Sequence, residues 1–248
     1  MKRRRTIATA LAASMVVMSG CIMPQPVQIQ TASPEFRWEP PGKEPSQHFT
    51  VALVLANFSK ESKFGAYRGK DYFKLFTGNL ATDLNRALLA KGFTVAGPFA
   101  SLEEMTYPDK KAAPIVLSPE VVVVLDESYS ENRTTPSFGG KRVSRKGTVT
   151  VTAFVKLLVV EPMSNQTIWL KRVEVPESSL PVEVDLLMDS EGNLNRFHNN
   201  VDNSDAVVVE VLNRLYPEVL RKFWNYLNPE EMGSMRKAAE EVRSRKVY

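Results

Sequence analysis

Residues 148–160 have the sequence TVTVTAFVKLLVV, and this stretch decides the fold. Its apolar side chains recur at every second position: Val149, Val151, Ala153, Val155, Leu157 and Val159. A period of two places these side chains on one face of a β-strand and the threonines at 148, 150 and 152 on the other. The stretch therefore predicts a long strand with one apolar face.

The sequence on both sides of this strand predicts antiparallel partners. Glu161–Asn165 has Pro162 at the second position of a hairpin turn, and Thr167–Val175 follows as the partner strand. On the other side, the β-branched run Val121–Leu125 is bordered by polar sequence and predicts a central strand. We expect at least three antiparallel strands in the middle of the chain.

A strand–helix–strand unit precedes these strands. Val51–Leu55 is entirely apolar, which is typical of a strand covered on both faces. From about Asp71, apolar residues at steps of three and four predict a helix that Gly92 ends, and Phe93–Ala96 then predicts a second strand. The segment Ser101–Glu104 predicts the start of a short helix, with Ser101 as N-cap.

The C-terminal part of the chain predicts two helices. An apolar stripe at helical spacing begins after Asn203, and Asn228–Pro229 begins a mostly polar last helix. Between the strands and these helices, Leu180–Asp202 is polar and predicts no regular element. The fold class that follows is α/β (α+β), with a mixed sheet, antiparallel hairpins in the middle and two C-terminal helices.

Composition divides the chain into four segments. The segment from residue 21 to 48 contains six prolines and predicts an extended tether. The predicted parts are a signal peptide at 1–20, the Pro-rich tether at 21–48, a single α/β domain at 49–228 and a C-terminal surface helix at 229–248.

The N-terminus has the pattern of a secretory signal peptide. Lys2–Arg5 is followed by an apolar run from Ile7 to Met18, which is too short to span a bilayer. Met18-Ser19-Gly20-Cys21 resembles the lipobox of bacterial lipoproteins, in which the thiol is acylated, palmitate being the expected fatty acid, and the chain is cut before it. An ordinary signal peptide with a chance cysteine is the alternative. We expect a membrane anchor on Cys21.

The charge balance argues against a nucleic-acid partner. Four of the 32 Lys and Arg residues precede Cys21 and none of the 28 acidic residues does, so the chain from Cys21 onward is nearly neutral. The basic pI of about 9.1 thus reflects the targeting segment. Cys21 is the one cysteine, so lipidation leaves no thiol for a disulfide, a metal or catalysis.

The sequence predicts neither an enzyme nor a metal protein. The two histidines, His48 and His198, lie at a domain edge and in a polar segment, and no nucleophile motif or phosphate loop is present. Four acidic residues could approach a cation, but their spacing does not match a calcium loop: Asp185, Asp189, Glu191 and Asp202. We expect no catalytic residues, no metal and no cofactor.

A candidate ligand site is the basic arm, residues 141–146, which follows a Pro- and Gly-containing turn. Its cations are Lys141, Arg142, Arg145 and Lys146. Guanidinium and ammonium groups pair well with the carboxylate of an acidic sugar such as sialic acid. The alternative is internal pairing across the hairpin, with Asp126, Glu127 or Glu131 of the opposing strand.

The chain resembles the neuraminyllactose-binding hemagglutinin family, bacterial outer-membrane lipoproteins associated with the flagellar sheath and described as adhesins. The resemblance rests on Val160–Ser164, Asp202–Ala206, Leu212-Asn213-Arg214 and the strand–helix unit ending in Gly92–Val95. The family's sialyl-binding motif, K-R-T-I-Q-K-K, falls on positions 141–147, where Lys141, Arg142 and Lys146 match and the other four residues differ.

The resemblance implies an outer-membrane lipoprotein adhesin that binds sialylated host glycans through the basic arm. Ile22, rather than Asp, follows the acylated position, which resembles the sorting pattern for the outer membrane. The alternative function is a structural or assembly lipoprotein of the envelope or flagellar sheath that acts through protein contacts, without sugar binding.

Overall fold

The computed structural model describes residues 33–137, 140–188, 191–192, 194–196 and 203–245. The predicted signal peptide, Cys21, Asp189, His198 and Asp202 lie outside these ranges. The elements are β1 (Thr50–Val54), β2 (Asn57–Phe58), the 3-10 turn η1 (Gly65–Tyr67), α1 (Asp71–Ala90), β3 (Thr94–Phe99), α2 (Tyr107–Ala112), β4 (Ile115–Ser137), β5 (Gly140–Glu161), β6 (Gln166–Glu174), β7 (Ser178–Met188), β8 (Leu194–Arg196), α3 (Ser204–Tyr226) and α4 (Pro229–Arg245).

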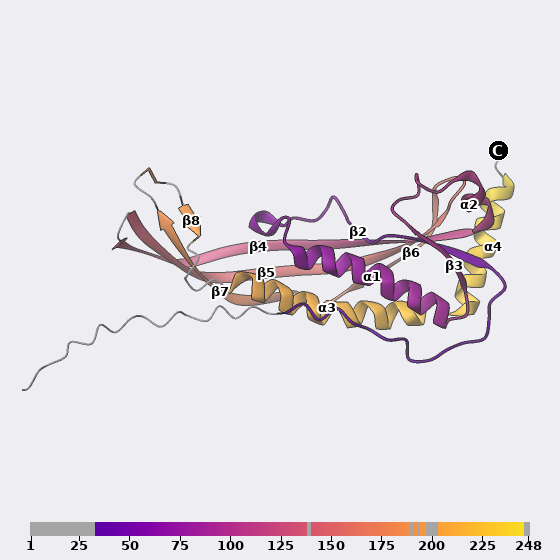
Figure 1. Ribbon diagram of the computed structural model, residues 1–248, viewed down its shortest axis with the longest axis horizontal. Helices are drawn as coiled ribbons and strands as arrows, with labels where there is room; N and C mark the ends of the chain where they lie inside the picture. The colour runs from indigo at the N-terminus through magenta and orange to yellow at the C-terminus, as the bar shows by residue number, and fades with distance from the viewer. Residues whose placement is uncertain (1–32, 138–139, 189–190, 193, 197–202, 246–248) are drawn as a thin grey trace, which may run out of the picture.

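The described strands form one mixed sheet, which confirms the predicted fold class. The strand order is β3-β1-β4-β5-β7-β8, with β2 added to β4 and β6 added to β5. β1 pairs in parallel with β3 and β4, whereas β4, β5, β6, β7 and β8 pair antiparallel. The strand–helix–strand unit and the antiparallel hairpins are therefore parts of a single sheet (Figure 1).

Two long helices form the second layer of the molecule. α1 and α3 run along the sheet, and α4 crosses its far end beside α2 (Figure 1). Phe76, Leu84, Leu212 and Val219 of the helices are fully buried in one cluster with the apolar face of β5. The alternating pattern of residues 148–160 therefore produces the predicted buried face.

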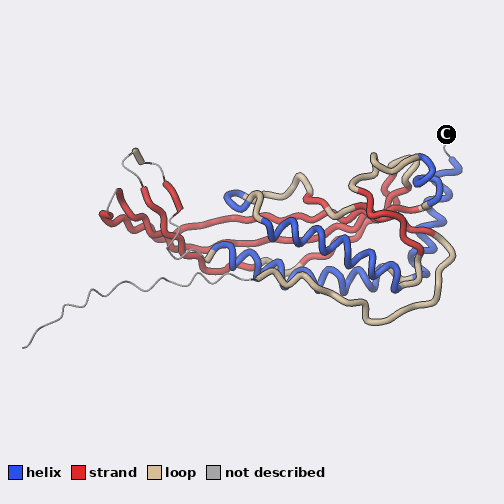
Figure 2. Tube along the Cα trace, in the orientation of Figure 1, coloured by secondary structure: helices blue, strands red, loops and turns tan. Residues whose placement is uncertain are grey.

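The hairpin of β4 and β5 extends beyond the helical layer (Figure 2). β4 has 23 residues and β5 has 22, and their antiparallel register runs from Val116↔Val160 to Ser137↔Gly140. The register shifts once, between Tyr129 and Glu131. Gly147 pairs with Tyr129 beside this irregularity, where the two backbones approach closely.

The N-terminal strap, residues 33–47, lies along α1 and α3. Phe36 is buried between Phe76 and Tyr216, with ring centroids 5.2 and 5.4 Å away. Asn213 holds the strap backbone at its start: its Oδ1 accepts from the amide of Glu35 at 2.8 Å and its Nδ2 donates to the carbonyl of Ser33 at 3.1 Å. The described part of the Pro-rich segment therefore packs on the helices, and its boundary with the domain stays a prediction.

Two local predictions are wrong. The N-cap of the short helix is Thr106, not Ser101, because the Thr106 hydroxyl accepts from the amide of Asp109 and the Asp109 carboxylate accepts from the amide of Thr106. Part of Leu180–Asp202, predicted to be irregular, forms β7. This strand contributes Val182 and Val184 to the core, each 2% exposed. Residues 182–186, VEVDL, alternate apolar and charged side chains, which is the pattern of a half-buried strand, and the prediction did not use it.

A buried ion pair joins the end of β5 to α4. Glu161 is fully buried, and its carboxylate accepts hydrogen bonds from Met163 N at 3.1 Å, Ser164 N at 2.7 Å and Arg243 Nε at 3.0 Å. Burial by itself raises the pKa of Glu161, but hydrogen bonds from Ser164, Met163 and Arg243 outweigh it and hold the pKa below its ordinary value.

Replacing Gly147 with Ala should lower the free energy of unfolding by about 1–3 kcal/mol. A Cβ at this position would lie 2.0 Å from the carbonyl oxygen of Ser128, a backbone atom that cannot move aside cheaply. Gly78→Ala is the matched control, because Gly78 lies in α1 with open space around it. This substitution should raise the free energy of unfolding by about 0.5–1 kcal/mol. Urea unfolding measures both changes; equal effects of the two substitutions would contradict the close approach.

Replacing Glu161 with Gln should lower the free energy of unfolding by about 2–3 kcal/mol at pH 7, because Arg243 loses its buried partner charge. A lowered folded-state pKa stabilises the fold above the ordinary value of 4.5, and this stabilisation is lost as the pH falls through the folded pKa. The difference in free energy of unfolding between wild type and variant, measured by urea unfolding, should therefore decrease below about pH 4.5. Glu218→Gln, at an exposed ion pair, should change stability by less than about 0.5 kcal/mol. A gap that stays constant from pH 7 to pH 3 would show that the charge of Glu161 is not the cause.

Candidate functional site

The four cations of the basic arm lie on β5, between β4 and β7. Successive side chains of a strand point to opposite faces. Arg142 and Lys146 therefore share one face of the sheet, and Lys141 and Arg145 share the other. The sequence motif is thus divided into two pairs, and its four cations do not converge on one small ligand.

On the first face, both cations pair with acids of β7. The guanidinium of Arg142 donates to Asp185 Oδ2, and Lys146 Nζ lies 3.2 Å from Glu183 Oε1. The Asp185 side chain is only 4% exposed, whereas that of Arg142 is 48% exposed. Two of the four arm cations are therefore internally paired, and their partners are on β7 and not among the β4 acids that the sequence suggested.

On the second face, Arg145 lies over the ring of Tyr129, with its Cζ 5.6 Å from the ring centroid. Its Nε–H is buried without a hydrogen-bond acceptor in the described residues. Lys141 is exposed, and the described part of the chain gives it no ion pair. Lys141 is thus an exposed arm cation whose charge no described acid offsets.

Two tyrosines are buried beneath the helices. Burial, and next the nearby carboxylate of Glu127, raises the pKa of Tyr67 well above its usual range. Burial, and next the carboxylate of Asp83, likewise raises the pKa of Tyr216, whose hydroxyl donates to Asp83 Oδ2 at 2.7 Å. Both hydroxyls therefore stay protonated at neutral pH and serve the packing of the core.

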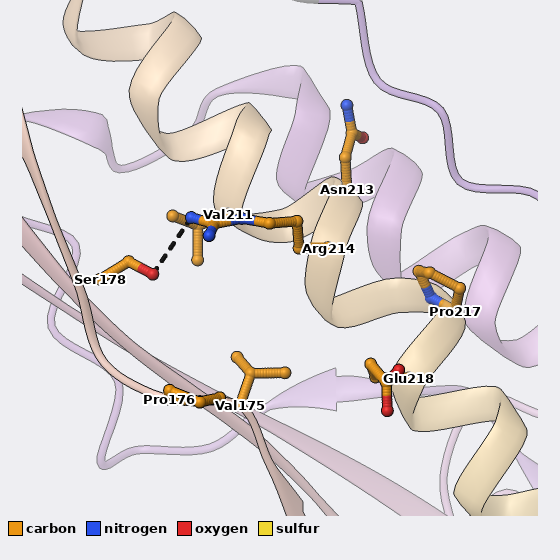
Figure 3. A pocket seen from close by; sticks show the side chains of 8 residues that line it. All are labelled: Val175, Pro176, Ser178, Val211, Asn213, Arg214, Pro217 and Glu218. Carbon is orange, nitrogen blue, oxygen red and sulfur yellow. Dashed lines mark hydrogen bonds between the residues drawn. The ribbon is translucent and has the colours of Figure 1, made fainter.

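A cavity of about 610 Å³ lies between α3 and the connection from β6 to β7 (Figure 3). Val175, Pro176 and Val211 form much of its wall, and Arg214 reaches across to donate to Ser178 Oγ at 3.1 Å. Asn213 also lines it, but its amide already holds the strap. Glu218 also lines the cavity, so its wall carries charges of both signs beside its apolar part.

Sequence reasoning did not find this cavity. Leu212-Asn213-Arg214 supported the family resemblance, but Ser178 lies 36 residues before Arg214 in the chain. No periodic pattern in the sequence relates Ser178 to Arg214, because their contact depends on how α3 packs along the sheet.

The described residues contain no group of three or more His, Cys, Asp or Glu side chains that could hold a metal. Of the acids considered from the sequence, Asp185 is paired with Arg142, while Asp189 and Asp202 lie outside the description. His48 is exposed at the start of the domain. No helix of the described chain is both long and apolar enough to cross a bilayer.

Comparison with known proteins gives one family. The family described as neuraminyllactose-binding hemagglutinin precursor matches residues 28–246. No curated protein sequence matches the chain.

Among solved structures, a neuraminyllactose-binding hemagglutinin homolog from Helicobacter pylori has a TM-score of 0.58 at 20% identity, with 83% of this chain and 97% of that chain covered. A protein from Xanthomonas campestris has a TM-score of 0.37 at 8% identity, covering 86% and 97%. A minor lipoprotein from Acinetobacter baumannii has a TM-score of 0.27 at 9% identity, covering 72% and 91%. The first likeness shows the fold, and the other two are too weak to support any conclusion.

Replacing Arg142 with Met should lower the free energy of unfolding by about 1–3 kcal/mol, because the buried Asp185 carboxylate loses its partner. Lys141→Met is the control and should change stability by less than about 0.5 kcal/mol. Adding Asp185→Leu to Arg142→Met should restore part of the loss, since the unpaired charge is removed. Urea unfolding measures all three; equal effects of the two single changes would refute a structural role for Arg142.

Proposed function

The chain belongs to the neuraminyllactose-binding hemagglutinin family, and from this membership we propose that it is a lipid-anchored outer-membrane adhesin without catalytic activity. The family match covers residues 28–246, and the family's description names binding to neuraminyllactose and no reaction. Membership supports an adhesin or envelope-lipoprotein role. The anchor on Cys21, the outer-membrane location and the sialylated ligand are the finer parts of the proposal.

The observation that carries the proposal is the hairpin that projects beyond the helical layer with cations near its end (Figure 2). Lys141 is exposed there and lacks an ion pair within the described residues, and Arg142, on the opposite face of the strand, is half exposed. Both groups are suited to a carboxylate that approaches from solution. We therefore place first contact with a sialylated glycan, or with a flagellar-sheath surface, at this end of the molecule.

A structural or assembly role without sugar binding is the second candidate. It is favoured by the internal pairing of Arg142 and Lys146 and by Leu170, which is 50% exposed on β6. Within the described chain, β6 pairs with β5 alone, so its outer edge carries backbone groups that another protein could meet.

Replacing both arm lysines, Lys141→Ala with Lys146→Ala, should reduce sialyllactose binding by about tenfold or more, because the unpaired charge of Lys141 is removed from the end of the hairpin. The purified lipoprotein should keep its stability within about 0.5 kcal/mol. Lys43→Ala with Lys237→Ala removes the same charge from exposed positions elsewhere and should leave binding unchanged. Equal binding by all three proteins would refute the arm as the sugar site.

Protease treatment of intact cells separates the two candidate functions. An adhesin must be cleaved from outside, and its loss should reduce attachment to sialylated surfaces. Full protection of the chain in intact cells, with cleavage after lysis, would favour the assembly role.

A further inference from the structure

A rigid surface loop follows β2 along the free side of β4. In this edge loop, residues 59–68, the amide of Ser59 donates to the carbonyl of Val121 at 2.8 Å. Lys63 continues the pairing: its amide donates to Val123 O at 2.9 Å, and its carbonyl accepts from Leu125 N at 2.9 Å. The loop is therefore held by the sheet as an irregular extra strand.

The side chain of Ser62 fills the gap in this pairing. Its Oγ donates to the carbonyl of Val121 at 3.3 Å and accepts from the amide of Val123 at 3.2 Å. Gly65 then takes a positive φ of 51°, which turns the chain away from the sheet. Sheet hydrogen bonds fix the loop before any ligand arrives, so the loop would lose little conformational entropy when a ligand binds.

The edge loop encloses a cavity of about 510 Å³, which is within the usual range for small-ligand sites. Phe58 and Phe64 line it, with ring centroids 5.0 Å apart in an edge-to-face pair. Both rings also pack against the buried ring of Phe73, at 5.5 and 4.8 Å. The aromatic part of the wall is thus anchored in the core.

The charged groups of this cavity have one sign. Lys60 and Arg68 line it, both are exposed, and neither has an ion pair in the part of the chain that the structure describes. Glu61, the acid of the loop, lies 2.6 Å from Lys156 and is neutralised by it. The cavity therefore presents two available cations, whereas Arg142 and Lys146 of the basic arm are already paired.

We infer that this cavity binds an anionic sugar, a pyranose that carries a carboxylate or a sulfate. Lys60 and Arg68 would receive the anion, with Arg68 able to bind it in a bidentate manner. The rings of Phe58 and Phe64 offer apolar surface to the C–H face of the sugar, and the hydroxyl of Ser59 can bond to a sugar hydroxyl. The inference rests on the proposed adhesin role for the class of ligand, but not on the basic arm.

The test compares 3′-sialyllactose, 3′-sulfolactose and uncharged lactose by calorimetry on the full lipoprotein in detergent. The double variant Lys60→Gln and Arg68→Gln should lose about a hundredfold in affinity for the acidic ligands that wild type binds, since each charged contact accounts for about tenfold. Arg68→Lys should retain part of the affinity. Lys237→Gln, an exposed lysine on α4, is the control and should bind as wild type does.

The outcomes separate this inference from the proposed function. Loss of affinity for the acidic ligands in the loop variant supports the edge-loop site, and the Lys141→Ala/Lys146→Ala variant then shows whether the basic arm makes a second contact. Whether sialyllactose, sulfolactose or both bind identifies the anion. Loss only in the arm variant overturns the edge-loop site and leaves the proposed adhesin role intact. Equal binding of lactose and the acidic ligands, or no acidic ligand bound by wild type, also overturns the inference.

Discussion

The hydrogen-bonded ladder of β5 is the constraint on which the rest of the structure depends. Along one side β5 pairs with β4 for nearly its whole length, and along the other its two halves pair with β7 and β6. A slip of one residue would move every apolar side chain of its buried face into solvent. The single register therefore determines where both helices pack and how far the hairpin projects.

The same ladder decides what the surface can bind. Strand alternation separates the cations of the basic arm, and β7 brings Asp185 and Glu183 beside two of them. The edge loop is different, because its pairing with β4 is irregular and both Lys60 and Arg68 line one cavity. An irregular segment held by a regular sheet is a common way to place functional groups precisely enough to bind.

Much of the fold could be predicted from sequence, because its strongest patterns are local. Alternation in residues 148–160 and the helical stripes after Asp71 and Asn203 correspond to β5, α1 and α3. Val182 and Val184 were missed although they alternate with Glu183 and Asp185, because a period of two over so few residues is a short signal beside the polar sequence that follows it. The candidate sites were harder to predict than the fold. Arg142 and Asp185 are 43 residues apart in the chain, and their pairing follows from the register of β5 against β7, which no local sequence pattern contains.

The attachment of the strap to α3 has a mechanical consequence. The chain preceding Ser33 leads to the N-terminus, so tension applied from that end reaches the domain first at the two hydrogen bonds of Asn213. These bonds act together, and behind them the ring of Phe36 would have to be extracted from between Phe76 and Tyr216. When the protein is pulled from its N-terminus, the hydrogen bonds of Asn213 and the packing of Phe36 would therefore bear the force before any strand of the sheet does.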